Sequence, residues 1–366
     1  MTVLKGMDSP PGRAAPHLVA DFVELMCLAT VDGEYGVADL RALRKAKDKD
    51  GATVRDHSER ELLLAEDDPT RDELDTAVAA ALDIELAEEE PEQLEVAGDD
   101  PSAANADPGP AAGDDNRSAE GAEVADVLSY RGERFGDAYP FELFDADNLR
   151  LSQQLEPQQQ LYVLLLIASC LSKLPKTEAA QVTATFERLA PAALSGHLGP
   201  RAEAHLFGTS AAAGDRYTGT LWSKLQQLET DFRIKLIAQQ EEIETNYSGD
   251  NGLDAVAWVP TGDNAETMVS LFAQCACGKR WRGKQQEASE VTWSGVFSFR
   301  SPIVNMLLIP YSFRKADGSW HQDYQVERGV LLDRERLIEA VRGADTELTG
   351  QLSEQLAERI IRQGIS

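Results

Sequence analysis

A long acidic segment without apolar periodicity divides this chain and most constrains what it can fold into. The segment runs from Glu85 to about Glu123 and contains Glu88–Pro91 and Asp107–Pro110. Such a composition buries too little apolar surface to offset the entropy lost on ordering the backbone. We therefore expect residues 85–123 to be a disordered, solvated spacer. A mimic of a nucleic-acid backbone, or an autoinhibitory tail, is the alternative that we favour less.

Helical patterns lie on both sides of this segment. Apolar residues recur at helical spacing between His17 and Lys49, which predicts a mainly α-helical N-terminal region over 1–84. Two further helices in that region are expected over 59–64 and 71–86. A helical middle segment is expected over 124–200, with a helix from Thr177 to Leu194 that Pro191 would kink or divide.

From residue 201 to residue 366 the pattern changes to a helix followed by strands. One helical face is formed by Leu221, Leu225, Leu228, Phe232 and Leu236. Strands are predicted over 253–259, 268–275 and 305–313, and terminal helices over 331–342 and 348–361. The fold class indicated is α/β, with a central mixed sheet flanked by helices.

The formal net charge of −28 for 366 residues is concentrated up to Pro200, where acidic residues outnumber basic ones more than two to one. An acidic surface repels phosphate backbones, so any nucleic-acid contact should use basic groups of the C-terminal part. The four cysteines form no disulfide framework, and the longest apolar run, Leu161–Leu171, is too short to span a bilayer. We expect a soluble cytoplasmic protein without a membrane partner.

Two polar residues in the apolar strands suggest a site. Asp254 is the only acid in its strand, and Gln274 comes at the end of the next strand, 20 residues later. A hairpin would bring the two side chains together, and hard cations such as Mg²⁺ prefer oxygen ligands. Alternatively, Asp254 is bound to backbone groups and Gln274 is a fully hydrogen-bonded buried amide. For Asp254 we favour the metal role, because an isolated buried acid is costly.

The two strands carry runs that resemble a known family. Gly249–Trp258 reads GDNGLDAVAW, and Gln274–Lys284 reads QCACGKRWRGK. They resemble the companion signatures GDGGLDVVAW and QCATGxxWxxK of PD-(D/E)XK, restriction-endonuclease-like proteins of bacterial defence loci. The stretch Leu332–Arg334 is also similar, though less distinctive. The runs cover a small fraction of the chain.

The resemblance implies a restriction-endonuclease-like core and DNA cleavage that depends on Mg²⁺ or Mn²⁺. Asp254 matches the family aspartate, and Gln274 replaces the family's acidic residue. Together with the carbonyl of Cys275, they would hold the metal. Ala276 stands where the family has a lysine, so Lys284 or Lys279 would supply the catalytic cation.

A neutral glutamine leaves such a site in need of a further carboxylate. Glu229, beside the apolar face of the preceding helix, is the first candidate, although a solvated role is at least as plausible for it; Glu244 is the second. The densest basic cluster adjoins the site and predicts phosphate contacts, with a solvated surface as the alternative. It consists of Lys279, Arg280, Arg282 and Lys284.

The function favoured here is a metal-dependent nuclease acting on DNA, within a larger defence system with other protein subunits. Two rivals remain open. One is a catalytically inactive nuclease fold that binds nucleic acid or serves as a scaffold, as Gln274 and Ala276 would allow. The other is an acidic interaction protein whose N-terminal half carries the function. Metal-dependent cleavage separates the first function from both rivals.

Overall fold

A computed structural model describes residues 14–30, 32–49, 110–144, 148–211, 214–246 and 249–342. The helices predicted over 59–64, 71–86 and 348–361 lie outside these residues, as does the expected linker up to residue 109. From residue 110 that segment is helical, because α5 spans Pro110–Phe135. None of the helices in the described ranges is both long and apolar enough to cross a membrane.

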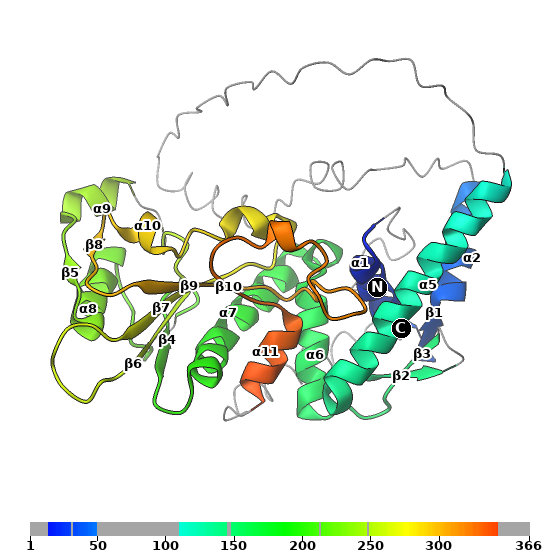
Figure 1. Ribbon diagram of the computed structural model, residues 1–366, viewed down its shortest axis with the longest axis horizontal. Helices are drawn as coiled ribbons and strands as arrows, with labels where there is room; N and C mark the ends of the chain where they lie inside the picture. Colours follow the sequence, from blue (N-terminus) through cyan, green and yellow to red (C-terminus); the bar gives the residue numbers. More distant parts are fainter. Residues whose placement is uncertain are drawn as a thin grey trace, which may run out of the picture.

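The architecture is mixed α/β, with a mixed central sheet flanked by helices (Figure 1). The five strands lie in the order β10-β9-β7-β6-β4. Strands β4, β6 and β7 pair antiparallel, whereas β7, β9 and β10 pair parallel. Their bounds are β4 Glu203–Leu206, β6 Ala255–Val259, β7 Val269–Cys275, β9 Ile303–Leu308 and β10 Val330–Leu332.

One face of the sheet packs against helices from the N-terminal and middle parts of the chain. Apolar residues of β6, β7 and β9 share one core with these helices, and α7 contacts β4, β6 and β7. The helix α7 continues through Pro191 without division. The helices that contribute to this core are α1 Pro16–Ala29, α2 Val37–Lys49, α5, α6 Pro157–Ala168, α7 Lys176–Leu198 and α11 Arg334–Val341. The helix α7 thus packs directly on strands that come after residue 200.

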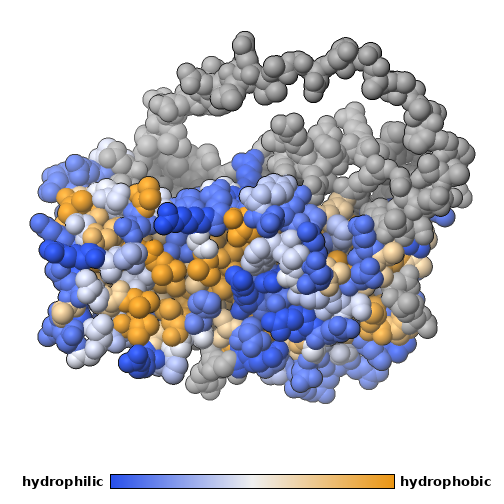
Figure 2. Space-filling view, in the orientation of Figure 1, coloured by the Kyte–Doolittle hydropathy of each residue, from blue (hydrophilic) through white to orange (hydrophobic). Residues whose placement is uncertain are grey.

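This face is not fully covered. Val269 of β7 is 54% exposed and Val304 of β9 is 38% exposed. Figure 2 shows apolar side chains gathered over the region of the sheet on the face in view.

The opposite face of the sheet carries a second core and a third, smaller one. The second contains Phe272 of β7, Leu228 of α8 and Trp293 of α10. The third joins Ala276 and Leu307 to Trp281 and Phe313. The elements on this face are α8 Leu221–Phe232, β5 Lys235–Leu236, α9 Gln240–Asn246, α10 Glu290–Trp293, β8 Phe297–Ser298 and the short 3-10 helices η3 Lys279–Lys284 and η4 Asp323–Gln325.

The N-terminal and middle parts are not purely helical. They contain a three-stranded antiparallel sheet in the order β1-β3-β2. It pairs β1, from before the 85–123 segment, with β3, from after it. The bounds are β1 Glu34–Gly36, β2 Phe141–Phe144 and β3 Asn148–Leu151, and two 3-10 turns are η1 Gly136–Ala138 and η2 Leu171–Lys173.

A buried ionic cluster fastens α1 to α5 and α11. Arg131 Nη1 lies 2.8 Å from Asp21 Oδ1 and 2.9 Å from Glu24 Oε2. Arg334 Nη1 lies 3.0 Å from Asp21 Oδ1. The Tyr162 hydroxyl donates to Glu24 Oε1 at 2.9 Å. Two carboxylates thus face two guanidinium groups, which keeps this interior close to neutral.

Candidate metal and nucleic-acid site

Asp254 lies immediately before β6 rather than within the strand, and it is fully buried. Its Oδ2 accepts a hydrogen bond from the backbone N–H of Cys275 at 2.7 Å. Its own carbonyl accepts from the backbone N–H groups of Phe207, at 2.8 Å, and Gly208, at 3.0 Å. One carboxylate oxygen of Asp254 is therefore bound to the backbone, as in the alternative to metal binding. The same contact fixes Asp254 beside the strand end that carries Gln274.

Gln274 is 1% exposed and belongs to β7. Its Nε2 donates to Glu287 Oε2, which orients the amide. Its Oε1 has no hydrogen-bond partner among the described residues. A buried amide oxygen without a donor costs free energy, and a bound cation would relieve that cost. The amide is thus only half satisfied, in contrast to the fully hydrogen-bonded alternative.

Two glycines show how closely the acidic side chains gather. A Cβ placed on Gly208 would lie 3.0 Å from Asp254 Oδ1 and 3.1 Å from Asp250 Oδ2. A Cβ placed on Gly252 would lie 2.6 Å from Glu287 Oε2. Side chains at these two positions would fill the space beside the carboxylates. We call the resulting group the Asp254 cluster; it consists of Asp250, Asp254, Gln274 and Glu287.

The loop before β6 is shaped to deliver this cluster. Asp250 Oδ1 accepts from the backbone N–H of Gly252 at 3.0 Å, and its Oδ2 accepts from that of Thr209 at 3.1 Å. Gly249, Asn251 and Gly252 all have positive φ angles, a conformation that glycine and asparagine tolerate. The run that resembles the family signature therefore has a structural reason for its two glycines.

The two carboxylates predicted from the sequence to join the site have other contacts. Glu229 Oε1 accepts from the backbone N–H of Leu236 at 2.9 Å, which closes the turn between α8 and β5. Glu244 lies on α9, where its Oε1 accepts from Gln240 Nε2 at 2.7 Å. The carboxylate that contacts Gln274 is that of Glu287. Sequence reasoning missed Glu287 because it follows the basic run in a segment whose return toward β7 is a tertiary feature.

Ala276, the position at which the resemblance implies a lysine, carries no cation and lies in an apolar core. Ala276 is 2% exposed and packs among the apolar side chains of the third core, including Trp281 and Leu307. Lys279 and Lys284 are the first and last residues of η3, and both are half-buried. The carbonyl of Lys284 accepts from the backbone N–H of Glu287 at 3.2 Å, so Lys284 lies one turn from the cluster.

The predicted phosphate contacts differ in their surroundings. Arg280 is exposed. The Arg282 guanidinium lies 4.8 Å from the Trp281 ring centroid and 5.3 Å from that of Phe313, and its Nε donates to Gln325. Arg282 is therefore engaged within the protein, whereas Arg280 reaches solvent.

A buried lysine that sequence reasoning missed lies behind the cluster. Lys224 Nζ donates to the carbonyls of Phe207, at 2.7 Å, and Gly208, at 3.2 Å. Burial lowers the pKa of Lys224, and the Asp250 carboxylate opposes this shift. A signal was available in the sequence, because Lys224 occupies a position within the apolar stripe of α8. Its contacts suit it to holding the 207–208 backbone in place.

The cluster offers oxygen donors of the kind that Mg²⁺ prefers: carboxylates, an amide oxygen and nearby carbonyls. Within the ranges that the structure describes, no group of three or more His, Cys, Asp or Glu side chains is arranged to hold a metal. A cation here would therefore depend on the Gln274 amide oxygen, together with the carboxylates of Asp254 and Glu287. The unsatisfied Gln274 oxygen makes this donor set chemically suitable.

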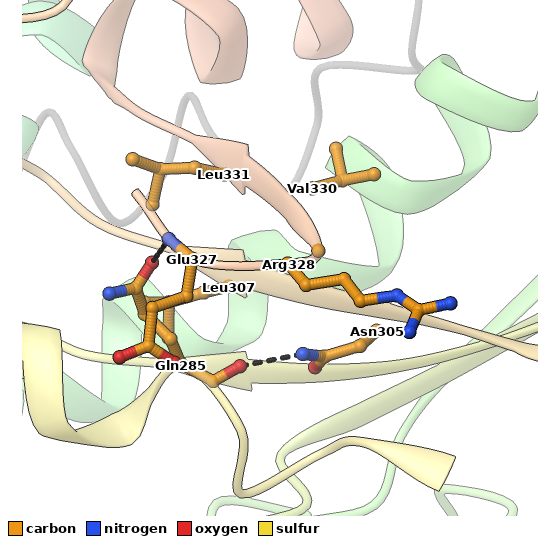
Figure 3. A pocket seen from close by; sticks show the side chains of 8 residues that line it. Gln285, Asn305, Leu307, Glu327, Arg328, Val330 and Leu331 are labelled. Atoms are coloured by element: carbon orange, nitrogen blue, oxygen red, sulfur yellow. Dashed lines mark hydrogen bonds between the residues drawn. The ribbon is translucent and has the colours of Figure 1, made fainter. Parts of the chain in front are cut away.

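A small pocket lies on the same face of the sheet and is lined in part by Leu307, which pairs in register with Gln274 (Figure 3). Asn305 Nδ2 donates to the carbonyl of Gln285 at 2.6 Å, and Gln285 Oε1 accepts from the backbone N–H of Glu327 at 2.8 Å. Arg328 extends across the pocket above Asn305 in this view. The hydrogen bond between Gln285 and Glu327 thus joins the segment that carries Glu287 to the loop before β10.

Comparisons of this chain with protein-family models, with curated proteins and with solved structures gave no match.

Proposed function

We propose that this protein is a nuclease of the PD-(D/E)XK type that hydrolyses phosphodiester bonds, with DNA as its substrate and Mg²⁺ or Mn²⁺ as its cofactor. One observation carries the proposal. The buried side chains of Asp254 and Gln274 lie at adjacent strand ends, and the Gln274 amide is oriented by Glu287 so that its oxygen lacks a donor. The order of elements supports the same fold: helix α8, strand β6 after Asp254, strand β7 with Gln274, helix α10 and buried strand β9.

In this proposal Asp254, Gln274 and Glu287 hold the metal, with the Cys275 carbonyl as a further oxygen donor. When bound, the metal polarises the phosphate and lowers the pKa of a water molecule. Lys284, one turn from Glu287, orients the attacking water and offsets the charge that develops on the phosphate. Lys279 is the second candidate for this role. Lys224 acts as a positioning residue, because its amine supports the backbone against which Asp254 is fixed.

The proposed biological role of this activity comes from the resemblance of the runs Gly249–Trp258 and Gln274–Lys284 to the family signatures. A role in defence against foreign DNA, alongside other protein subunits, fits that resemblance and completes the proposal. The acidic N-terminal part makes duplex contact there unfavourable, so the basic residues of η3 are the proposed phosphate contacts.

The experiment is a cleavage assay on labelled DNA with MgCl₂, MnCl₂ or excess EDTA. We expect metal-dependent cleavage that Asp254→Asn abolishes and that Glu241→Gln, an exposed change on α9, leaves intact. Loss of cleavage with DNA binding retained in Lys284→Ala would assign the lysine role to it; the same result in Lys279→Ala alone would assign the role there. Asp254→Asn protein that stays folded and cleaves at the normal rate would refute the proposal.

A second function has specific support. Gln274 is neutral, and Ala276 is packed in an apolar core where a lysine amine would be buried. Both features are expected of a nuclease fold that has lost catalysis and binds nucleic acid or acts as a scaffold. DNA binding without cleavage under any of the metal conditions would establish this function instead.

A further inference from the structure

We propose that Tyr324 is a nucleobase-stacking residue and that the surface around it binds single-stranded nucleic acid. This surface, which we call the Tyr324 surface, comprises Tyr324, Arg328, Lys279, Arg280 and Lys284. The inference names the substrate class for the proposed nuclease. The statement that the bound single strand is cleaved rests on that proposed function, whereas the statement that it is bound does not.

Tyr324 stands out from the other aromatic residues of its neighbourhood. It is 75% exposed, and it is the one aromatic side chain in the described ranges that is largely exposed. Nearby Trp281 and Phe313 are buried in the third core. Those two rings already serve as packing. The Tyr324 ring has no comparable packing role, and exposing an apolar ring to water is unfavourable unless something covers it.

The loop that carries Tyr324 is fixed to the basic segment. Gln285 Nε2 donates to the carbonyl of Gln325 at 2.9 Å, and Gln286 Nε2 donates to the carbonyl of Arg328 at 3.0 Å. Arg282 also donates to the Gln325 side chain. The yellow η3 and the orange η4 accordingly lie close together in Figure 1. The tyrosine is therefore held at a set position relative to η3.

The same contacts lead from Tyr324 to the Asp254 cluster. Gln286, which binds the Arg328 carbonyl, is followed directly by Glu287, which binds Gln274. Leu307 of the third core pairs in register with Gln274, so this core and the cluster occupy one face of the sheet. A single strand of nucleic acid that lies over η3 and η4 would thus be close to the Asp254 cluster.

Charge complementarity identifies the occupant. Arg280 and Arg328 are exposed, and Lys279 and Lys284 are half-buried; all four belong to η3 or to the loop of Tyr324, which hydrogen bonds hold together. Asp323 and Glu327 are exposed on the same loop and reduce the net charge without cancelling it. Cations that follow a phosphate backbone, combined with an aromatic ring for a base, form the usual arrangement of single-strand binding surfaces. In a duplex the base faces are stacked on one another, so a protein ring gains little from them.

The experiment measures binding in EDTA, so that cleavage cannot interfere. Fluorescence anisotropy would compare a labelled single-stranded oligo(dT), its duplex with oligo(dA), and an oligo(rU). We expect Tyr324→Ala to weaken binding of the single strand about tenfold or more and to leave duplex binding nearly unchanged. Tyr324→Phe should retain binding, because the ring does the stacking. Val291→Ala, at an exposed apolar position on α10, is the control.

Two further arms complete the test. Lys284→Ala should make binding less salt-dependent, whereas Tyr324→Ala should leave the salt dependence unchanged, since only the lysine releases counterions. The ratio of oligo(dT) to oligo(rU) affinity assigns the strand to DNA or RNA. Normal single-strand binding by Tyr324→Ala, or equal losses for single strand and duplex, would overturn the inference. Because these measurements need no metal, a chain that binds but never cleaves would refute only the nuclease proposal.

Discussion

Gln274 is the residue on which the metal proposal can be tested without any activity. In the Gln274→Glu variant a fourth carboxylate would join those of Asp250, Asp254 and Glu287. Without a cation these charges repel one another in a buried site, so the variant should melt at a lower temperature than the wild type. Mg²⁺ should then raise its melting temperature more than it raises that of the wild type.

Thermal unfolding with and without MgCl₂ checks this prediction. Gln240→Glu adds the same charge at an exposed position on α9 and serves as the matched control. An identical response to Mg²⁺ in wild type, Gln274→Glu and control would show that no cation binds beside Gln274.

His17 provides a pH-dependent contribution to stability. Its ring is 3% exposed, and its centroid lies 4.5 Å from that of His321. Burial, followed by the charges of His321 and nearby arginines, holds the pKa of His17 well below 6.5. The folded protein therefore keeps His17 neutral, while the unfolded chain takes up a proton as the pH falls below 6.5. Stability is present above that pH and is lost below it.

Urea unfolding at pH 7.5 and pH 5.5 tests this contribution. The wild type should lose stability between the two values, with a slope of up to about 1.4 kcal/mol per pH unit from one such group. The loss should be smaller in His17→Gln and unchanged in His197→Gln, where the exposed imidazole lies near the end of α7. Equal losses in wild type and His17→Gln would exclude His17 as the source.

At the level of single residues, the sequence indicated some members of the candidate site and missed others, for identifiable reasons. Asp254 and Gln274 could be singled out because a polar residue in an apolar strand, or directly beside one, is unusual whatever the tertiary fold. Glu287 could not, since its contact with Gln274 depends on how residues 276–287 fold back. Lys224 could have been found, because it is a charged residue within the apolar stripe that identified α8 as a helix.

At the scale of elements, the packing of α7 against α11 depends on Gly196. A Cβ at this position would lie 1.8 Å from the carbonyl oxygen of Ala340. Replacing glycine by alanine within a helix ordinarily stabilises it by about 0.5–1 kcal/mol. Gly196→Ala should do the opposite and destabilise the protein by about 1–3 kcal/mol, because the two helices must separate.

Chemical denaturation of Gly196→Ala measures this effect. Gly283→Ala is the control, since a Cβ there would have no heavy atom within 4 Å. A gain in stability for Gly196→Ala would mean that α11 can shift without cost, in which case the tight contact contributes little to the fold.

Elements with long patterns were predicted better than short ones. The helix expected over Thr177–Leu194 is found as α7, and the strands with Asp254 and Gln274 are displaced by a residue or two at most. Leu331 and Leu332 were assigned to a helix, but they form β10 and pair with β9. The missed strands have two to four residues each, too few to show a period; they are β1, β2, β3, β4, β5, β8 and β10. Their pairing is decided by neighbours far away in the chain.

For the molecule as a whole, the ionic cluster around Asp21 and Glu24 is the main polar connection between α1 and the rest of the fold. Arg334→Met would leave two buried carboxylates facing one guanidinium group. Removing one partner from a buried ion pair commonly costs about 3–5 kcal/mol. Arg342→Met, which breaks an exposed contact with Glu339, should cost at most about 1 kcal/mol.

The measurement is the free energy of unfolding of Arg334→Met and of Arg342→Met, each compared with that of the wild type. Adding Asp21→Asn to Arg334→Met should recover part of the loss, since one unbalanced charge is removed. If Arg334→Met is as stable as Arg342→Met, the cluster does not hold α1 in place.

The span of this cluster also affects how the protein is made. Asp21 and Arg334 are separated by 313 positions in the chain. At a synthesis rate of about 5–20 residues per second, α1 waits roughly 15 to 60 s on the ribosome before Arg334 has been added. During that interval Arg131 is the one guanidinium group of the cluster that its carboxylates can meet. The ionic cluster is therefore completed only late in synthesis, although α1 can already pack against α5, β1, β3 and α6; until then Asp21 and Glu24 share a single guanidinium group.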